Sequence, residues 1–173
     1  MYDHYLVFDV ESIGLHGEGF AFGYVVIDSK GKVQEEGIRS CPMDIAQGTA
    51  SNRQWVATNI RPLPITDRTT KGVREAFWAI WMKWKDKNTA LVADCAWPVE
   101  ARFLLSCVDD RFGDREWGGP YPLHELASLI LATGKDPLES TPRLPDELPA
   151  HDPLNDSRHS ARQLTEALNV LLP

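Results

Sequence analysis

The sequence has few cysteines, no excess of positive charge and no long apolar run. Cys41, Cys95 and Cys107 form no CxxC pair, which argues against a disulfide framework or a thiolate zinc site and favours a reducing compartment. No apolar run approaches the roughly 20 residues of a membrane span, and the N-terminus lacks the segments of a signal peptide. We therefore expect a cytoplasmic protein that does not enter a membrane.

Acidic residues outnumber basic ones. The chain has 18 Lys and Arg against 25 Asp and Glu, which gives a net charge of −7 and a pI near 5.2. This balance argues against a broad electrostatic grip on duplex DNA or on an anionic membrane. A polyanionic substrate would have to be held locally, by metal ions and a few placed groups. The length of 173 residues, 43% of them hydrophobic, predicts one domain over residues 1–173.

Hydrophobic patterning predicts alternating strands and helices. The strands are expected at 5–8, 20–27, 33–38 and 89–93. The helices are expected at about 70–87, 98–107, 123–133 and 153–171. The stretch 41–67 has no clear period and predicts a long loop with room for a short helix, and four prolines in 134–150 exclude regular structure there.

Aromatic residues and the final helix give more specific predictions. Trp78, Trp81 and Trp84 recur at helical spacing, which favours core packing over a stacking platform for bases. Asp152 suits the N-cap of the last helix and Pro153 its first position. His159 falls inside that helix, where a solvated face is expected.

Asp9 and Glu11 form an acidic pair after the first apolar run. Side chains at i and i+2 of a strand point to the same side, so the two carboxylates would lie together and repel each other. A divalent cation removes that repulsion, and a few oxygen ligands suit Mg²⁺ or Mn²⁺ rather than zinc. The simpler interpretation is an ordinary solvated strand edge.

Further acids and a histidine follow later strands and the last helix. Asp94 ends a later strand, and Glu100 lies six residues on, where a helix begins. Asp156 lies one turn into the last helix, whose dipole favours an ionised carboxylate, and His151 can face the same site from outside the helix. His151 and Asp156 alone could be a capped helix start, but the order of these groups along the chain favours one metal-dependent site.

Two segments resemble motifs of the DEDDh 3′-5′ exonucleases, which include polymerase proofreading subunits, RNase T and oligoribonuclease. Residues 8–15, Phe-Asp-Val-Glu-Ser-Ile-Gly-Leu, resemble the first motif, Asp-x-Glu-Thr-x-Gly-Leu, and 151–156 is similar to the third, His-x4-Asp. The resemblance implies an RNase H-like α/β fold, with a mixed five-stranded sheet flanked by helices. It also implies two Mg²⁺ or Mn²⁺ ions and, from RNase T and oligoribonuclease, a homodimer.

The resemblance also assigns roles to residues in the first and third motifs. Asp9 would bridge the two ions, Glu11 and Asp156 would complete the first, and His151 would be the general base. The pocket for the 3′-terminal nucleotide would be lined by Ser12, Ile13, Gly14 and Leu15.

The second motif departs from the family pattern. Glu100, followed by Phe103 and Leu104, fits if one residue is inserted. Asp94 competes with it, because it ends the strand and keeps the usual residue type. We prefer Asp94 at this point and keep Glu100 as the alternative acid.

The residues predict a metal-dependent site, and the resemblance implies that the protein is a metal-dependent 3′-5′ exonuclease. It would hydrolyse single-stranded RNA or DNA from 3′ ends and release nucleoside 5′-monophosphates. One alternative is an RNase H-like endonuclease, which would not need His151, and another is an inactive domain that binds nucleic acid or a protein partner. RNA and DNA are not distinguished, because no residue that senses a 2′-hydroxyl can be recognised without geometry.

Overall fold

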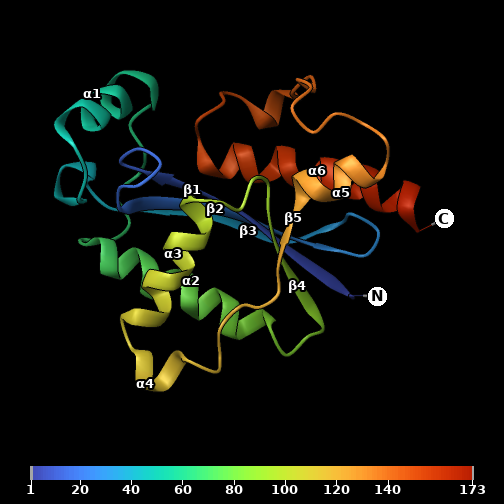
Figure 1. The fold of residues 1–173 in the computed structure, drawn as a ribbon, viewed down its shortest axis with the longest axis horizontal. Helices are drawn as coiled ribbons and strands as arrows, with labels where there is room; N and C mark the ends of the chain where they lie inside the picture. Colours follow the sequence, from blue (N-terminus) through green and yellow to red (C-terminus); the bar gives the residue numbers. More distant parts are fainter. Residues whose placement is uncertain (1, 173) are drawn as a thin grey trace.

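The computed structural model describes residues 2–172 and is built on a five-stranded sheet (Figure 1). Its strands are β1 (His4–Ser12), β2 (Gly19–Asp28), β3 (Val33–Ser40), β4 (Thr89–Ala93) and β5 (Leu123–Glu125). They lie in the order β3-β2-β1-β4-β5, with β1, β2 and β3 antiparallel and β1, β4 and β5 parallel. The expected α/β fold with a mixed sheet is confirmed.

Helices cover both faces of this sheet. They are α1 (Ala50–Asn59), α2 (Thr70–Trp84), α3 (Val99–Asp109), α4 (Phe112–Arg115), α5 (Leu126–Ala132) and α6 (Pro153–Leu171), with 3-10 turns η1 (Met43–Ile45) and η2 (Pro145–Glu147). Figure 1 shows α5 and α6 on one face and α2 and α3 on the other. Within residues 2–172, no helix has the length and hydrophobicity that crossing a bilayer requires.

The side chains of β1 alternate between two hydrophobic clusters. Leu6, Phe8 and Val10 pack in the cluster that includes residues of α2 and α3. Tyr5 and Val7 pack on the other face with residues of α5 and α6. Because the period of a strand is two, Asp9 and Glu11 continue on the face that α6 covers. The strand therefore delivers both carboxylates beneath the start of α6.

A glycine brings α6 close to these carboxylates. Gly23 of β2 pairs with Asp9 across the sheet. A Cβ at Gly23 would lie 2.1 Å from the carbonyl carbon of Pro153, so only a residue without a side chain lets the helix begin directly on the sheet. The helix begins as predicted, with Asp152 as N-cap and Pro153 at the first position.

Some boundaries differ from the sequence predictions. The stretch 41–67, expected to be a long loop with room for a short helix, contains the ten-residue helix α1. The segment 123–133 divides into β5 and α5, because its first three residues pair with β4. β1 extends to Ser12, beyond the predicted 5–8. The three tryptophans at 78, 81 and 84 are buried, as predicted.

Candidate active site

Three groups from two distant parts of the chain converge beyond the last residues of the β1–β4 pairing. A carboxylate oxygen of Glu11, one of Asp156 and a ring nitrogen of His151 all lie within 4.8 Å of one another. Glu11 and Asp156 are half-buried and His151 is exposed. The structure thus brings together one acid of the first motif with both ends of the third motif.

Asp9 lies beside this group in a strongly acidic environment. Partial burial, and then the carboxylates of Glu11, Glu100 and Asp156, raise the pKa of Asp9 well above its usual range. Burial and the same kind of repulsion, led by Asp156, raise the pKa of Glu11 to about 7. Both acids of the first motif therefore resist ionisation unless a cation is present.

His151 and Asp156 are held by a local backbone contact. The backbone N–H of His151 donates to Asp156 Oδ2 at 3.0 Å. His151 adopts φ = 60°, a left-handed conformation that is strained for a residue with a side chain. Its ring packs edge-on against Trp55 of α1, with centroids 5.8 Å apart. These contacts fix the imidazole at the edge of the acidic group.

The structure separates the two candidates for the second acid. β1 extends past its last pair with β4, between Phe8 and Ala93, so the N–H of Val10 faces no β4 residue. Glu100, in the first turn of α3, is 7% exposed, and its Oε1 accepts a hydrogen bond from that N–H at 3.3 Å. Asp94 is exposed. The geometry therefore favours Glu100, contrary to the preference for Asp94 drawn from residue type and strand position.

The electrostatics of Glu100 agree with this placement. Burial raises its pKa to about 7 against the opposing hydrogen bond from Val10, and Asp94 adds to the increase. Of the two candidates, Glu100 contributes to the raised pKa values of both Asp9 and Glu11, whereas Asp94 contributes to that of Asp9 but not to that of Glu11. Glu100 therefore interacts with both acids of the first motif.

The donor set fits hard divalent cations. Glu11, Glu100 and Asp9 offer carboxylate oxygens on half-buried or buried side chains, whose pKa values are raised by burial and by repulsion from neighbouring acids. Oxygen donors of this kind suit Mg²⁺ or Mn²⁺, and a nearby cation would restore the ionised state of each acid. One cationic side chain already reaches the group, because Arg143 Nη1 contacts Asp156 Oδ1 at 2.5 Å.

A hollow of about 420 Å³ adjoins the acids on the side of α1. Its lining comprises Val10, Glu11, Ser12, Gly14, Leu15, Asn52, Trp55 and Val99. Three of the four expected pocket residues are among them. Ile13 is the exception, because its side chain is completely buried in the core and only its carbonyl oxygen faces Asn52, which donates to it at 3.4 Å. Asn52 and Trp55 come from a helix that the sequence did not predict in full.

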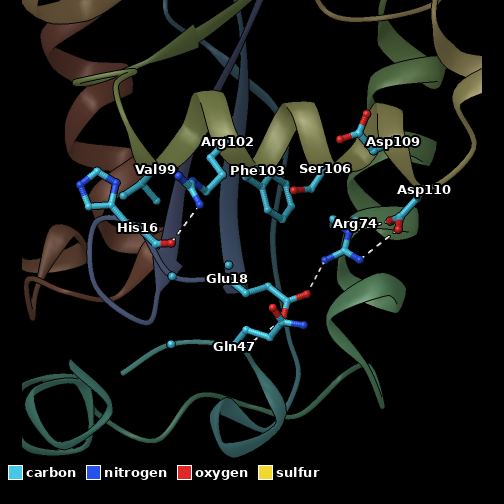
Figure 2. Close-up of a pocket in the computed structure, with 13 residues that line it drawn as sticks. His16, Glu18, Gln47, Arg74, Val99, Arg102, Phe103, Ser106, Asp109 and Asp110 are labelled. Atoms are coloured by element: carbon cyan, nitrogen blue, oxygen red, sulfur yellow. Dashed lines mark hydrogen bonds and ion pairs between the residues drawn. The ribbon is translucent and has the colours of Figure 1, made fainter. Parts of the chain in front are cut away.

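A second, polar hollow of about 540 Å³ lies beside the loop that follows the first motif, and the residues that line it hold this loop in place (Figure 2). Figure 2 shows Arg74 between Glu18 and Asp110, with ion-pair distances of 2.8 and 2.6 Å. On the other side, Arg102 donates to the carbonyl oxygen of His16 at 3.0 Å. These bonds tie both ends of the 16–18 segment to α2 and α3 and so fix the loop that carries residues 12–15.

The segment before His151 is anchored through a buried acid. Glu147, 2% exposed, accepts from Arg162 Nε at 2.7 Å and lies 2.9 Å from His159 Nδ1. Burial opposes ionisation, but the hydrogen bonds from Arg162, Leu144 N–H and His159 outweigh it and lower the pKa of Glu147 to about 2. The sequence predicted a solvated face for His159. In the structure His159 instead pairs with Glu147, an acid from outside its helix.

Solved structures share this architecture. A zinc-bound Escherichia coli exonuclease I in complex with single-stranded DNA superposes with a TM-score of 0.64 at 14% identity, over 100% of this chain and 42% of that one. Exonuclease I of Methylocaldum szegediense gives 0.65 at 14% identity, over 94% and 40%. The fold is that of exonuclease I. The expected RNase H-like architecture and the resemblance to that group of nucleases are thereby confirmed at the level of the fold.

The likeness is structural and partial. An E. coli exonuclease I bound to a dT13 oligonucleotide gives a TM-score of 0.61 at 16% identity, over 96% of this chain and 41% of that one. The chain thus spans about two fifths of the length of these exonucleases. A scan of protein families and a search of curated proteins give no match to the sequence.

Proposed function

We propose that the protein is a metal-dependent 3′-5′ exonuclease that acts on single-stranded nucleic acid. The observation that carries the proposal is the convergence of Glu11, His151 and Asp156 within 4.8 Å, beside an Asp9 whose pKa is raised by burial and by the surrounding carboxylates. The shared fold with exonuclease I, whose structures contain single-stranded DNA, supports the same assignment. DNA is therefore the first substrate to test, and RNA the second.

In this proposal, Asp9, Glu11, Glu100 and Asp156 hold two divalent ions, Mg²⁺ or Mn²⁺. Bound ions would lower the barrier by stabilising the charge on the attacking and leaving oxygens. The exposed imidazole of His151 accepts the proton of the attacking water. The bond between phosphorus and the O3′ of the preceding nucleotide breaks, so the terminal nucleotide leaves with its 5′-phosphate.

We assign the second-motif role to Glu100. Its carboxylate is buried and accepts a hydrogen bond from the N–H of Val10, the residue between Asp9 and Glu11 in β1. The side chain of Asp94 is more exposed; burial raises its pKa, which His159 and Arg143 lower and Asp156 raises further. A buried, fixed carboxylate loses less conformational freedom when it binds an ion than an exposed one.

The hollow beside the acids would receive the terminal nucleoside. Trp55 is 51% exposed and Leu15 is 64% exposed, so two apolar surfaces flank the space in front of Glu11. Stacking on an aromatic ring accepts any base and requires that the base is unpaired. This geometry suits a single-stranded 3′ end. One domain over 1–173, a homodimer and a cytoplasmic location stay predictions.

A labelled-strand assay tests the proposal. A 5′-labelled single strand is incubated with the protein and Mn²⁺, with Asp9→Asn as the matched inactive control. A ladder that shortens from the 3′ end supports the exonuclease. Internal cuts would indicate the RNase H-like endonuclease, and intact strands with measurable binding would indicate an inactive binding domain.

A further inference from the structure

An arginine from outside the three motifs reaches into the acidic group. Arg143 Nη1 lies 2.5 Å from Asp156 Oδ1 and donates to the carbonyl oxygen of Glu147 at 3.0 Å. Its side chain is 25% exposed. Both bonds use the same nitrogen, so within residues 2–172 the Nε and Nη2 of this guanidinium have no hydrogen-bond partner. The guanidinium of Arg143 therefore has N–H donors without a partner beside the proposed metal ligands.

The backbone on either side of Arg143 is fixed to α6. Arg162 Nη2 donates to the carbonyl oxygen of Pro142 at 2.9 Å, and the N–H of Leu144 donates to Glu147 Oε2 at 2.9 Å. Glu147 is in turn paired with Arg162. The backbone on either side of Arg143 is thus held in place, and its side chain, which is 25% exposed, extends from this fixed point to Asp156. The fixed backbone therefore keeps the guanidinium of Arg143 close to the acidic group.

Ion binding would change which oxygen atoms the guanidinium of Arg143 can pair with. Asp156 Oδ2 already accepts from the backbone of His151, so an ion on Asp156 would compete with Arg143 for Oδ1. A guanidinium displaced from a carboxylate pairs best with another oxyanion, and its planar fork matches a phosphate. The phosphodiester is the oxyanion that the reaction brings to this place.

We propose that Arg143 is a substrate-binding residue that contacts the phosphate of the scissile bond, and afterwards the 5′-phosphate of the released nucleotide, when ions occupy the acids. The inference rests on the proposed exonuclease function. It adds a positive charge where the reaction concentrates negative charge on the phosphoryl oxygens, which is where such a group lowers a barrier most.

The test compares Arg143→Met and Arg143→Lys with Arg111→Met, which removes the same charge from an exposed i,i+3 pair elsewhere. On a short oligothymidylate at saturating Mn²⁺, Arg143→Met should lower kcat by roughly 10²-fold, the scale of losing one donor to the reacting oxyanion. The inhibition constant of thymidine 5′-monophosphate should rise roughly tenfold, since the product phosphate loses a charged partner. Arg143→Lys should recover part of both effects, because it keeps the charge without the fork.

Mn²⁺ titration by calorimetry separates this role from charge compensation of Asp156. Tighter Mn²⁺ binding in Arg143→Met with unchanged kcat and product inhibition would overturn the inference. If Arg143→Met does not fold by circular dichroism, unchanged kcat and product inhibition in a folded Arg143→Lys would overturn it as well. If the wild-type protein cuts nothing, the exonuclease proposal fails separately, and Arg143-dependent binding of thymidine 5′-monophosphate in Mn²⁺ still decides the contact.

Discussion

Two acids near the start of α6, Glu11 and Glu147, have opposite ionisation behaviour. Glu147 is nearly inaccessible to solvent, yet its pKa is lowered to about 2, because bonds from Arg162, Leu144 and His159 outweigh its burial. The pKa of Glu11 is raised to about 7, first by burial and then by repulsion from Asp156 and Glu100. At Glu147 the neighbouring donors outweigh burial, whereas at Glu11 the neighbouring carboxylates add to it, and this difference separates a structural acid from a candidate ion ligand.

Asp156 connects the two environments. One of its oxygens accepts from Arg143, which the Glu147 anchor holds in place, and the other accepts from the backbone of His151. It also repels Glu11 and Asp9. The acid of the third motif is therefore partly neutralised, whereas the acids of the first motif are not.

The largest expected effect comes from the unneutralised acids. Asp9→Asn should lower nuclease turnover by about 10³-fold or more, because it removes an ion ligand from the centre of the group. The same change should leave the metal-free protein as stable or more stable, because it removes a charge from a repelling cluster. Turnover and thermal unfolding without metal check the two parts. Near wild-type turnover would mean that Asp9 holds no ion.

His151→Ala should lower turnover by roughly 10² to 10⁴, the range for loss of a general base, with little change in Mn²⁺ affinity. His4→Ala is the matched control, since His4 lies at the other end of β1 and packs on Trp84. His159 cannot serve as the control, because it pairs with Glu147. Equal losses at His4 and His151 would remove His151 from the mechanism and favour the endonuclease.

Glu100→Gln should lower turnover by roughly 10²-fold and Asp94→Asn by about tenfold or less, because only Glu100 is buried beside both acids of β1. Mn²⁺ titration should show the same order of effects on ion affinity. The reverse order in both measurements would return the second-motif role to Asp94.

Glu147→Gln should destabilise the fold by roughly 3 kcal/mol, because it leaves Arg162 and His159 without their anionic partner. Since the folded pKa is lowered to about 2, the contribution of Glu147 is present above pH 4.5 and is lost as the pH falls toward 2. Denaturant unfolding at pH 7 and pH 3 measures both. A variant whose stability loss is the same at the two pH values would contradict this account.

The smallest effect concerns the metal-free protein at neutral pH. Glu11 and Glu100 have raised folded pKa values of about 7, so the folded state binds more protons than the unfolded state between pH 4.5 and 7. Their contribution to stability is therefore fully present below pH 4.5 and is lost as the pH rises from 4.5 through 7. Saturating Mg²⁺ should flatten this dependence. A pH profile that Mg²⁺ leaves unchanged would argue against ion binding by these acids.

The sequence by itself indicated the acids of β1, the cap of α6 and the pairing of His151 with Asp156. These signals are local: strand alternation places Asp9 and Glu11 on one face, and the Asp152-Pro153 pair marks a helix start. Helix α2 and its buried tryptophans followed from helical spacing for the same reason.

The tertiary structure alone decided the remaining parts of the site. Helix α1 buries only Val56, so it has no apolar stripe to reveal it, and Trp55 and Asn52 were not expected at the pocket. The proposal of Glu100 in place of Asp94 rests on strand register, because β1 extends beyond β4 and the N–H of Val10 pairs with Glu100. Arg143 contacts Asp156 from a segment that Glu147 ties to Arg162, fifteen residues away in the chain. Contacts between distant segments have no period in the sequence, so only the folded chain determines them.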